Sequence, residues 1–261
     1  MAKTEQLDEI TGCSDKATLL GNSIPVWVYL VDGLLVDAGP YSLRRQFMQF
    51  FRKSRIEQVA VTHTHEDHCG LAASLQREKQ VPVYVPAASV KETYSKGRVP
   101  VYRRMIWGRR PAFESREMPE YVETNRFRFL PVFSPGHCKQ HLAFLEEERG
   151  WLFTGDVYVR KNPVVAITDE NMNELIKTLR YLLKFDFQTV FCSHAGILQN
   201  GREALSAKLE YLLEKREMVQ DMRKQGKSER EMEQAIYPGR LPIELVSRGE
   251  WSRRNIVNTL A

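Results

Sequence analysis

The sequence has few of the features that mark membrane, secreted or disulfide-bonded proteins. Its 261 residues contain no apolar run of about eighteen residues, so no segment is expected to cross a bilayer. The N-terminal stretch MAKTEQLDEITG is polar and has no apolar region of the kind that a secretory signal needs. The four cysteines form no C-x-x-C pair, which argues against a disulfide framework. These absences predict a cytoplasmic protein without a membrane partner.

A strong charge surplus is also missing. The 38 basic and 33 acidic residues give a formal net charge of +5, which permits an anionic substrate or nucleic acid but demands neither. Hydrophobic residues make up 43% of the chain and charged residues 27%, a balance typical of globular proteins. The length predicts one large domain, or one domain with an appendage.

Short apolar runs alternate with amphipathic stretches. Asp32-Gly33 separates IPVWVYLV from LLVDAG, which predicts a β-hairpin. The pattern of strands followed by helices predicts a layered α/β or α+β domain with a C-terminal helical extension. Further strands are expected at 56–63, 81–86, 127–133, 141–146, 151–156 and 188–194, and helices at 42–52, 68–79, 171–185 and from 201 onward, with a break at Gly226.

Half of the six histidines fall in the stretch VTHTHEDHCG. On an extended strand His63 and His65 point the same way, because side chains alternate. Asp67 and His68 begin the next helix and approach from another direction. Imidazole and carboxylate groups suit zinc, iron or manganese. Two pairs of side chains from two directions predict two metal positions.

The other chemically notable residues follow later strands. His137, His141, Asp156 and His194 each lie at or beside the end of an expected strand. Active sites are commonly assembled from loops at strand ends. We therefore expect these side chains to meet the histidine-rich stretch.

The order of five motifs resembles that of the metallo-β-lactamase superfamily of metal-dependent hydrolases. The motifs are LLVDAG, HTHEDH, GHCKQH, TGD and SHAG, and they span about residues 24–200. The resemblance implies an α+β fold of the αββα sandwich type. Residues 1–200 would form the catalytic domain, with 93–125 as a candidate cap insertion. Residues 201–261 would be a helical extension packed on it.

The resemblance also implies a set of metal ligands. Two divalent ions are expected, with zinc preferred and iron or manganese as alternatives. A hydroxide that bridges them would attack an ester, thioester or lactone of a small metabolite. One ion is expected on His63, His65 and His137, and the second on Asp67, His68 and His194, with Asp156 bridging both.

Three residues have implied roles in catalysis. Asp37, in the VDAG turn, would orient ligands. His141 would support the site without binding metal. Asp67 would also take up a proton as the reaction intermediate collapses. In glyoxalase II enzymes a tyrosine lies two residues beyond the last histidine ligand, and Gly196 stands there in this chain, so glutathione-thioester specificity is not implied.

Residues 93–113 contain one lysine, five arginines and no acid, with aromatic residues between them. One interpretation is a patch for an anionic substrate or a phosphate backbone; the other is a solvated basic surface. The main prediction is a small-molecule substrate, with nucleic acid not favoured. The alternatives are a phosphodiesterase or ribonuclease with the same metals, and a mononuclear iron dioxygenase. The candidate substrate contacts are Arg103, Arg104, Trp107 and Tyr158.

Three cysteines lie within two positions of an expected ligand, namely Cys69, Cys138 and Cys192. Thiolate ligands or redox control are one interpretation. We expect packing residues instead, because free cysteines commonly behave as small apolar side chains.

Overall fold

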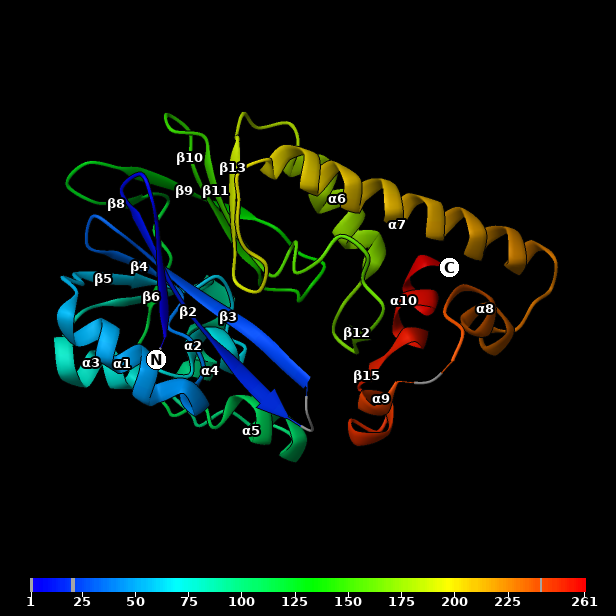
Figure 1. The fold of residues 1–261 in the computed structure, drawn as a ribbon, viewed down its shortest axis with the longest axis horizontal. Helices are drawn as coiled ribbons and strands as arrows, with labels where there is room; N and C mark the ends of the chain where they lie inside the picture. The colour runs from blue at the N-terminus through cyan, green and yellow to red at the C-terminus, as the bar shows by residue number, and fades with distance from the viewer. Residues whose placement is uncertain (1, 20–21, 240) are drawn as a thin grey trace.

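The computed structural model describes residues 2–19, 22–239 and 241–261. Two sheets dominate it, and Figure 1 shows them side by side, with a small two-stranded pair near the C-terminal helices. The first sheet has the order β1 (Lys3–Leu7), β2 (Ile10–Leu19), β3 (Asn22–Val31), β4 (Leu34–Val36), β5 (Gln58–Ala60), β6 (Val83–Val85) and β7 (Arg116–Glu117). The second has the order β14 (Gly196–Leu198), β13 (Thr189–Cys192), β11 (Trp151–Gly155), β10 (Leu142–Glu146), β9 (Arg128–Phe133) and β8 (Val122–Glu123), and the small pair is β12 (Ala166–Ile167) with β15 (Trp251–Ser252).

Helices cover the outer face of each sheet (Figure 1). On the side of the first sheet they are α1 (Arg44–Lys53), α2 (Glu66–Cys69), α3 (Ala72–Lys79), α4 (Val90–Thr93) and α5 (Val101–Trp107), with short 3-10 turns η1 (Tyr41–Leu43) and η2 (Ala87–Ser89). On the side of the second sheet they are α6 (Met172–Leu182), α7 (Gly201–Lys224), α8 (Glu229–Ile236), α9 (Pro242–Val246) and α10 (Arg253–Leu260).

Three apolar clusters separate four layers. The first joins helices to the first sheet, as Phe47 of α1 packs with Val28 of β3. The second lies between the sheets, where Tyr29 meets Phe153 and Phe191 edge to face. The third joins the second sheet to its helices and includes Leu145, Leu179 and Leu212. Helix, sheet, sheet and helix therefore follow in order, and the expected αββα sandwich is confirmed.

The hairpin expected at Asp32-Gly33 is present, with β3 and β4 antiparallel. Both turn residues have positive φ, 43° and 85°, which suits the twist of adjoining strands. The expected helix at 68–79 is wrong in one respect. It is two helices, α2 and α3, and at the break the Leu71 N–H donates to the Gly39 carbonyl at 3.1 Å. At Gly70 an added Cβ would lie 2.5 Å from the Glu66 carbonyl oxygen, so only glycine fits there.

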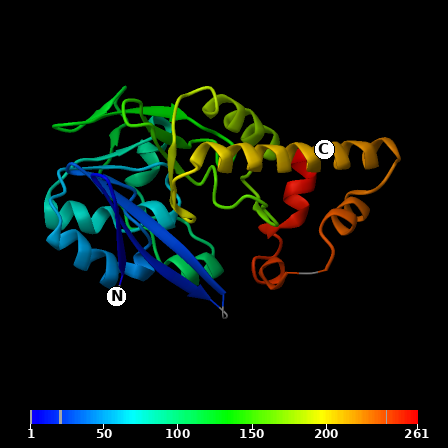
Figure 2. The same cartoon turned by 45° about the horizontal axis from the view of Figure 1, so that its top comes forward.

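The C-terminal helices pack on the second sheet. Leu205, Leu212 and Val219 of α7 are buried in the third cluster, together with Ile256 and Leu260 of α10. Figure 2 shows α10 lying beside the long helix α7. The expected helix break at Gly226 is found, where φ is 75°. In the described part of the chain, no helix combines the length and apolar character that a membrane crossing needs.

Candidate metal centre

Loops at the ends of strands from both sheets bring the expected ligands together. His63 and His65 follow β5, and α2 carries Asp67 and His68. The remaining three follow strands of the second sheet. Two groups result, each with its donor atoms within 4.8 Å of one another. We call His63, His65 and His137 the three-histidine cluster, and Asp67, His68, Asp156 and His194 the aspartate–histidine cluster.

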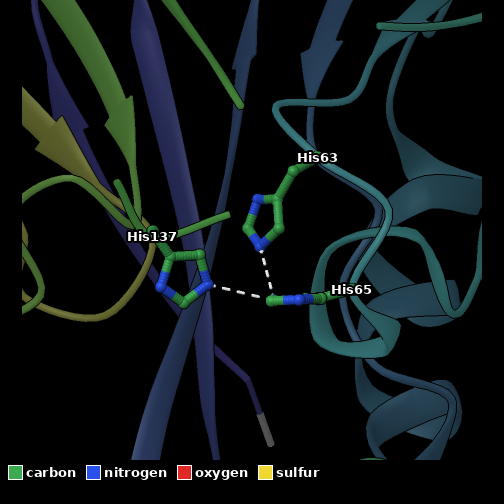
Figure 3. Close-up of side chains that lie close together, drawn as sticks. All are labelled: His63, His65 and His137. Atoms are coloured by element: carbon green, nitrogen blue, oxygen red, sulfur yellow. Dashed lines mark hydrogen bonds between the residues drawn. The ribbon is translucent and has the colours of Figure 1, made fainter. Parts of the chain in front are cut away.

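In the three-histidine cluster the rings point toward a common centre (Figure 3). Nδ1 of His65 lies 2.9 Å from Nε2 of His63 and 3.0 Å from Nε2 of His137. His63 is fully buried and His137 nearly so. Three imidazole nitrogens that converge in this way form the donor set of many zinc sites.

Asp156 faces both clusters. Its Oδ2 lies 3.4 Å from Nε2 of His68 and 3.4 Å from Nε2 of His137. Its Oδ1 lies 3.4 Å from Nε2 of His194. Asp67 completes the second group, with Oδ2 3.3 Å from the same His194 nitrogen. One carboxylate thus stands between the two sets of donors.

Hydrogen bonds fix the histidines of the aspartate–histidine cluster. Nδ1 of His68 lies 2.8 Å from Oδ2 of Asp37, and Nδ1 of His194 donates to the carbonyl of Pro25 at 2.7 Å. Asp37 is itself held, because it accepts bonds from Thr62 N at 2.8 Å and Ser193 Oγ at 3.1 Å. In each imidazole Nδ1 is occupied, and Nε2 is turned to the centre.

Glu170 and Thr62 also contact the Nδ1 atoms of ligand histidines, and neither was expected from the sequence. Oε1 of Glu170 lies 2.7 Å from Nδ1 of His137, and Thr62 Oγ1 lies 3.1 Å from Nδ1 of His63. Thr62 directly precedes His63, so its position in the motif was a usable signal. Glu170 lies 33 residues from His137 and belongs to no motif.

His141 uses both ring nitrogens within the protein. Nδ1 lies 2.9 Å from Ser134 Oγ, and Nε2 accepts the backbone N–H of Asp156 at 3.1 Å. The contact is close because Gly155 has φ 47°, and a Cβ there would lie 2.7 Å from His141 Nε2. Burial and the nearby His137 lower the pKa of His141 to about 3. A neutral ring with both nitrogens bonded can position Asp156 but offers no atom to a metal.

The two clusters differ in charge. Burial, together with the neighbouring imidazoles, lowers the pKa of His63 and of His65 well below the usual value. Burial alone would also lower the pKa of His68 and His194, but the carboxylates, Asp156 foremost, outweigh it and raise both pKa values. Burial would raise the pKa of Asp156, yet the surrounding histidines hold it well below the usual range.

The donor set fits divalent metal ions. His68 Nε2 and Asp156 Oδ1 are buried and have no hydrogen-bond partner among the residues that the structure describes. Such atoms are costly to bury unless something binds them. Imidazoles with one nitrogen free, beside ionised carboxylates, are the ligands that zinc, iron and manganese take.

The cysteines are unsuited to bind metal as thiolates. Burial raises the pKa of Cys69 well above its usual value and that of Cys138 to about 12. The Sγ of Cys69 donates to the carbonyls of Thr64 and His65 at 3.3 Å. Cys192 is fully buried. Cys69 and Cys192 pack as expected, whereas Cys138 is only partly buried.

A cavity of about 230 Å³ opens at the two clusters. His65, Asp67, His137, Asp156 and His194 line it, and its other walls are mainly apolar, from Trp107, Val165, Ile167 and Trp251. Of the candidate substrate contacts, Arg103 and Trp107 line this cavity. Arg104 is exposed and Tyr158 packs against the third apolar cluster, and neither lines it.

Arg103 is already paired. Its guanidinium donates to Glu66 at 2.5 and 2.9 Å and to Glu250 at 3.3 Å. A bidentate pair of this kind fixes the arginine in place. Arg103 therefore forms part of the cavity wall and has little capacity left for a substrate anion.

Comparison with known proteins supports this interpretation. A family model described as the metallo-beta-lactamase superfamily matches residues 22–194, about two thirds of the chain. A hydroxyacylglutathione hydrolase of Legionella pneumophila is 26% identical over 67% of this chain and 63% of its own length. An atrochrysone carboxyl ACP thioesterase of Aspergillus fumigatus is 23% identical over 82% of this chain and 67% of its own. The chain thus spans less than two thirds of the hydroxyacylglutathione hydrolase.

Solved structures share the fold. A beta-lactamase domain protein from Burkholderia ambifaria aligns with a TM-score of 0.72 at 19% identity, covering 98% of this chain and 87% of that one. A metallo-beta-lactamase family protein from Thermus thermophilus aligns with a TM-score of 0.69 at 16% identity, covering 97% and 91%. With the family model, the motifs and the geometry in agreement, the chain belongs to the metallo-beta-lactamase superfamily.

Proposed function

We propose that this chain is a dinuclear metal-dependent hydrolase of thioesters with a small acyl group. The observation that carries the proposal is one carboxylate, Asp156, between two sets of ligand-type side chains at a small apolar cavity. The names of two relatives support a thioester over an ester or lactone, since one is called a thioesterase and another hydrolyses an acylglutathione.

The three-histidine cluster would hold one ion, and Asp67, His68 and His194 would hold the second, with Asp156 shared. Zinc is proposed, with iron or manganese as alternatives. Two divalent ions at such a site lower the pKa of a shared water from about 15.7 toward about 7 and polarise the substrate carbonyl.

The protein's own groups keep the donor atoms aimed. Glu170, Asp37 and the carbonyl of Pro25 occupy the Nδ1 atoms of three histidines, so that each Nε2 faces the centre. His141 holds the backbone N–H of Asp156 and thereby the direction of its carboxylate. Ligands fixed in advance need not reorganise when the substrate reacts.

Asp67 would also accept a proton as the tetrahedral intermediate breaks down. Burial would raise its pKa, but His68 and His194 lower it, so the carboxylate is ionised but a weak base, and it would hold the proton only in passing. An Asp67→Asn protein that kept both metals and full turnover would contradict this role.

The cavity decides which part of a substrate fits beside the metals. Pockets for drug-sized ligands have volumes of about 300–1,000 Å³, and this one, at about 230 Å³, is smaller. Its apolar walls, with Trp107 and Trp251, would exclude water from the reacting carbonyl. A short apolar acyl chain fits this space better than a polar one.

The other functions have less support. Polymer phosphodiesters need a cationic track, but Arg103 is paired with Glu66 and Glu250, and Arg109 donates to Tyr41 at 2.7 Å. A mononuclear iron dioxygenase would need only one metal position, and the ligand-type residues of the aspartate–histidine cluster would then have no explanation. The domain boundary after residue 200, a cap role for 93–125 and a cytoplasmic location remain predictions.

The test is metal reconstitution followed by a substrate panel. Protein stripped of metal and reloaded with zinc, manganese or iron is assayed on acyl thioesters, esters, lactones and bis-nitrophenyl phosphate. We expect short-chain thioesters of N-acetylcysteamine to give the highest kcat/KM and His63→Ala to abolish turnover. A faster phosphodiester reaction that declines steeply with salt would favour the nuclease alternative. Oxygen consumption with iron would favour the oxygenase.

A further inference from the structure

A second and larger cleft adjoins the metal centre. Its volume is about 1,030 Å³, and it shares His65, Arg103 and Glu170 with the small cavity. Its lining includes the segments 95–100, 138–140 and 168–171. A substrate whose acyl group fills the small cavity would therefore extend its leaving group into this cleft.

Arg110 lies in the wall of this cleft without an acidic partner. Its side chain is buried, with the residue 8% exposed. Nη2 donates to the carbonyl of Glu92 at 3.2 Å, and Nη1 has no hydrogen-bond partner. Within the described residues, no carboxylate oxygen lies within 4.0 Å of this guanidinium.

The other arginines in similar settings are paired. Arg253, also buried, lies 2.9 Å from Glu244, and Arg103 lies 2.5 Å from Glu66. A buried guanidinium without a counter-charge is costly, and arginine is suited to bind carboxylate or phosphate with two parallel hydrogen bonds. Arg110 is thus a cation in a cleft wall whose counter-charge the described protein does not supply.

Charged residues of both signs line the cleft with Arg110. The basic residues Lys96, Arg98 and Lys139 line the same cleft. Gly97 brings the loop directly against the arginine: its N–H donates to the Arg110 carbonyl at 3.0 Å, and a Cβ at Gly97 would lie 2.6 Å from Arg110 Nε. Five acids also line the cleft, and four of them are engaged elsewhere: Glu66 with Arg103, Glu170 with His137, Glu174 with Lys177 and Glu92 with the Thr64 hydroxyl. The fifth, Asp169, is exposed.

We propose that Arg110, assisted by Lys96, Arg98 and Lys139, binds an anionic group on the thiol leaving group of the substrate. The anion would be a phosphate or a carboxylate, several bonds away from the thioester sulfur. This inference rests on the proposed thioesterase function, and it adds that the natural thiol is negatively charged.

The test compares three thioesters of one acyl group on the metal-loaded enzyme. The thiol parts are N-acetylcysteamine, which is neutral, 4′-phosphopantetheine, which carries a phosphate, and glutathione, which carries carboxylates. For Arg110→Gln we expect KM for a charged thioester to rise about tenfold or more with kcat unchanged, since a charge-assisted bond used for binding is lost. KM for the neutral thioester should change by less than about twofold, and the charged substrate that responds identifies the anion.

Two further variants guard against a folding defect. Lys139→Gln changes an exposed side chain and should raise KM for the charged thioester about twofold to fivefold, as expected for an exposed ion pair. Arg109→Gln, the exposed neighbour outside the cleft, should leave all three substrates unchanged. Equal losses on neutral and charged thioesters in Arg110→Gln, or no change on any, would overturn the subsite.

A parallel binding measurement separates this inference from the proposed function. Calorimetric titration of metal-loaded protein with free 4′-phosphopantetheine should show binding that weakens in Arg110→Gln. If no thioester is hydrolysed while this binding persists and depends on Arg110, the thioesterase proposal fails and the anion subsite holds. If thioesters are hydrolysed but neither phosphopantetheine nor glutathione binding depends on Arg110, the subsite fails alone.

Discussion

The three-histidine cluster and the aspartate–histidine cluster meet at Asp156 but are built differently. The first has only imidazole donors. Glu170 and Thr62, which are not members of the cluster, form hydrogen bonds with its histidines. The second includes two carboxylates, and a third carboxylate, that of Asp37, is hydrogen-bonded to Nδ1 of His68. The burial of both is similar, so the difference between them is one of charge.

This difference has a consequence for metal binding. Lowered pKa values keep His63 and His65 neutral and ready to bind a cation at neutral pH. Raised pKa values leave His68 and His194 protonated in the metal-free protein. A metal ion that enters the second cluster must therefore displace protons, whereas one that enters the first need not. The two positions should fill with different dependence on pH.

The largest effect is expected where the clusters are joined. Asp156→Asn removes the shared negative charge and should lower kcat/KM by about 10³-fold or more, because both metal positions are weakened. Thioesterase kinetics and metal content by mass spectrometry measure this change. Asp186→Asn, at an exposed aspartate distant from the motifs, is the matched control and should behave as wild type. An Asp156→Asn protein that still bound two ions tightly would contradict the shared role of Asp156.

Glu170 and Asp37 each hold a histidine of one cluster, so their loss should affect the two metal positions separately. Glu170→Gln should weaken metal binding in the three-histidine cluster about 10–100-fold, as the loss of a carboxylate behind a histidine ligand usually does. Asp37→Asn should do the same for the aspartate–histidine cluster. Chelator competition resolves the two affinities. Asp169→Asn, the exposed neighbour of Glu170, should change neither, and a Glu170→Gln protein that weakened both sites equally would contradict separate supports.

The two clusters should also differ in how their metal affinity depends on pH. As the pH falls from 8 to 6, affinity at the aspartate–histidine cluster should decrease by up to about tenfold per pH unit for each proton displaced, because the pKa values of His68 and His194 are raised. Affinity at the three-histidine cluster should change less, because the pKa values of His63 and His65 are lowered. Zinc titrations from pH 6 to 8 measure both. If zinc affinity at the three-histidine cluster fell as steeply with pH as at the aspartate–histidine cluster, the proposed charge difference between the clusters would be contradicted.

The smallest effect is expected at His141. His141→Gln removes a neutral acceptor of the Asp156 N–H, and about 1 kcal/mol for one hydrogen bond corresponds to about a fivefold loss of turnover. Metal content should remain at the wild-type level in both clusters, because His141 offers no free nitrogen. Loss of one ion in this variant would show that His141 is a ligand after all.

The motifs predicted the fold and brought the right residues together because their information is local. In HTHEDH the strand-to-helix turn itself separates His63 and His65 from Asp67 and His68, and no distant residue is needed to predict this. The N-terminal strand β1 was missed because its residues are exposed, so KTEQL has no apolar alternation to show a strand. It forms only through pairing with β2.

The parts that could not be predicted depend on distant contacts. Glu170 acts on a histidine 33 residues away and lies in a segment without a motif. The arginines of 93–113 look alike in sequence, but their tertiary contacts differ. Arg103 is paired with an acid and Arg104 is exposed, whereas Arg110 is buried and has no acidic partner among the described residues. Burial, which the sequence does not reveal at single positions, decides their roles.

The most direct test of the account is the number of metal ions that thioester hydrolysis requires. Metal-free protein is titrated with zinc at pH 7.5, and bound zinc and turnover of an N-acetylcysteamine thioester are followed together. The account predicts two bound equivalents, with turnover completed only as the second ion binds, and one equivalent at most in His63→Ala and in His194→Ala. Full turnover at one equivalent, with no second ion bound, would contradict it.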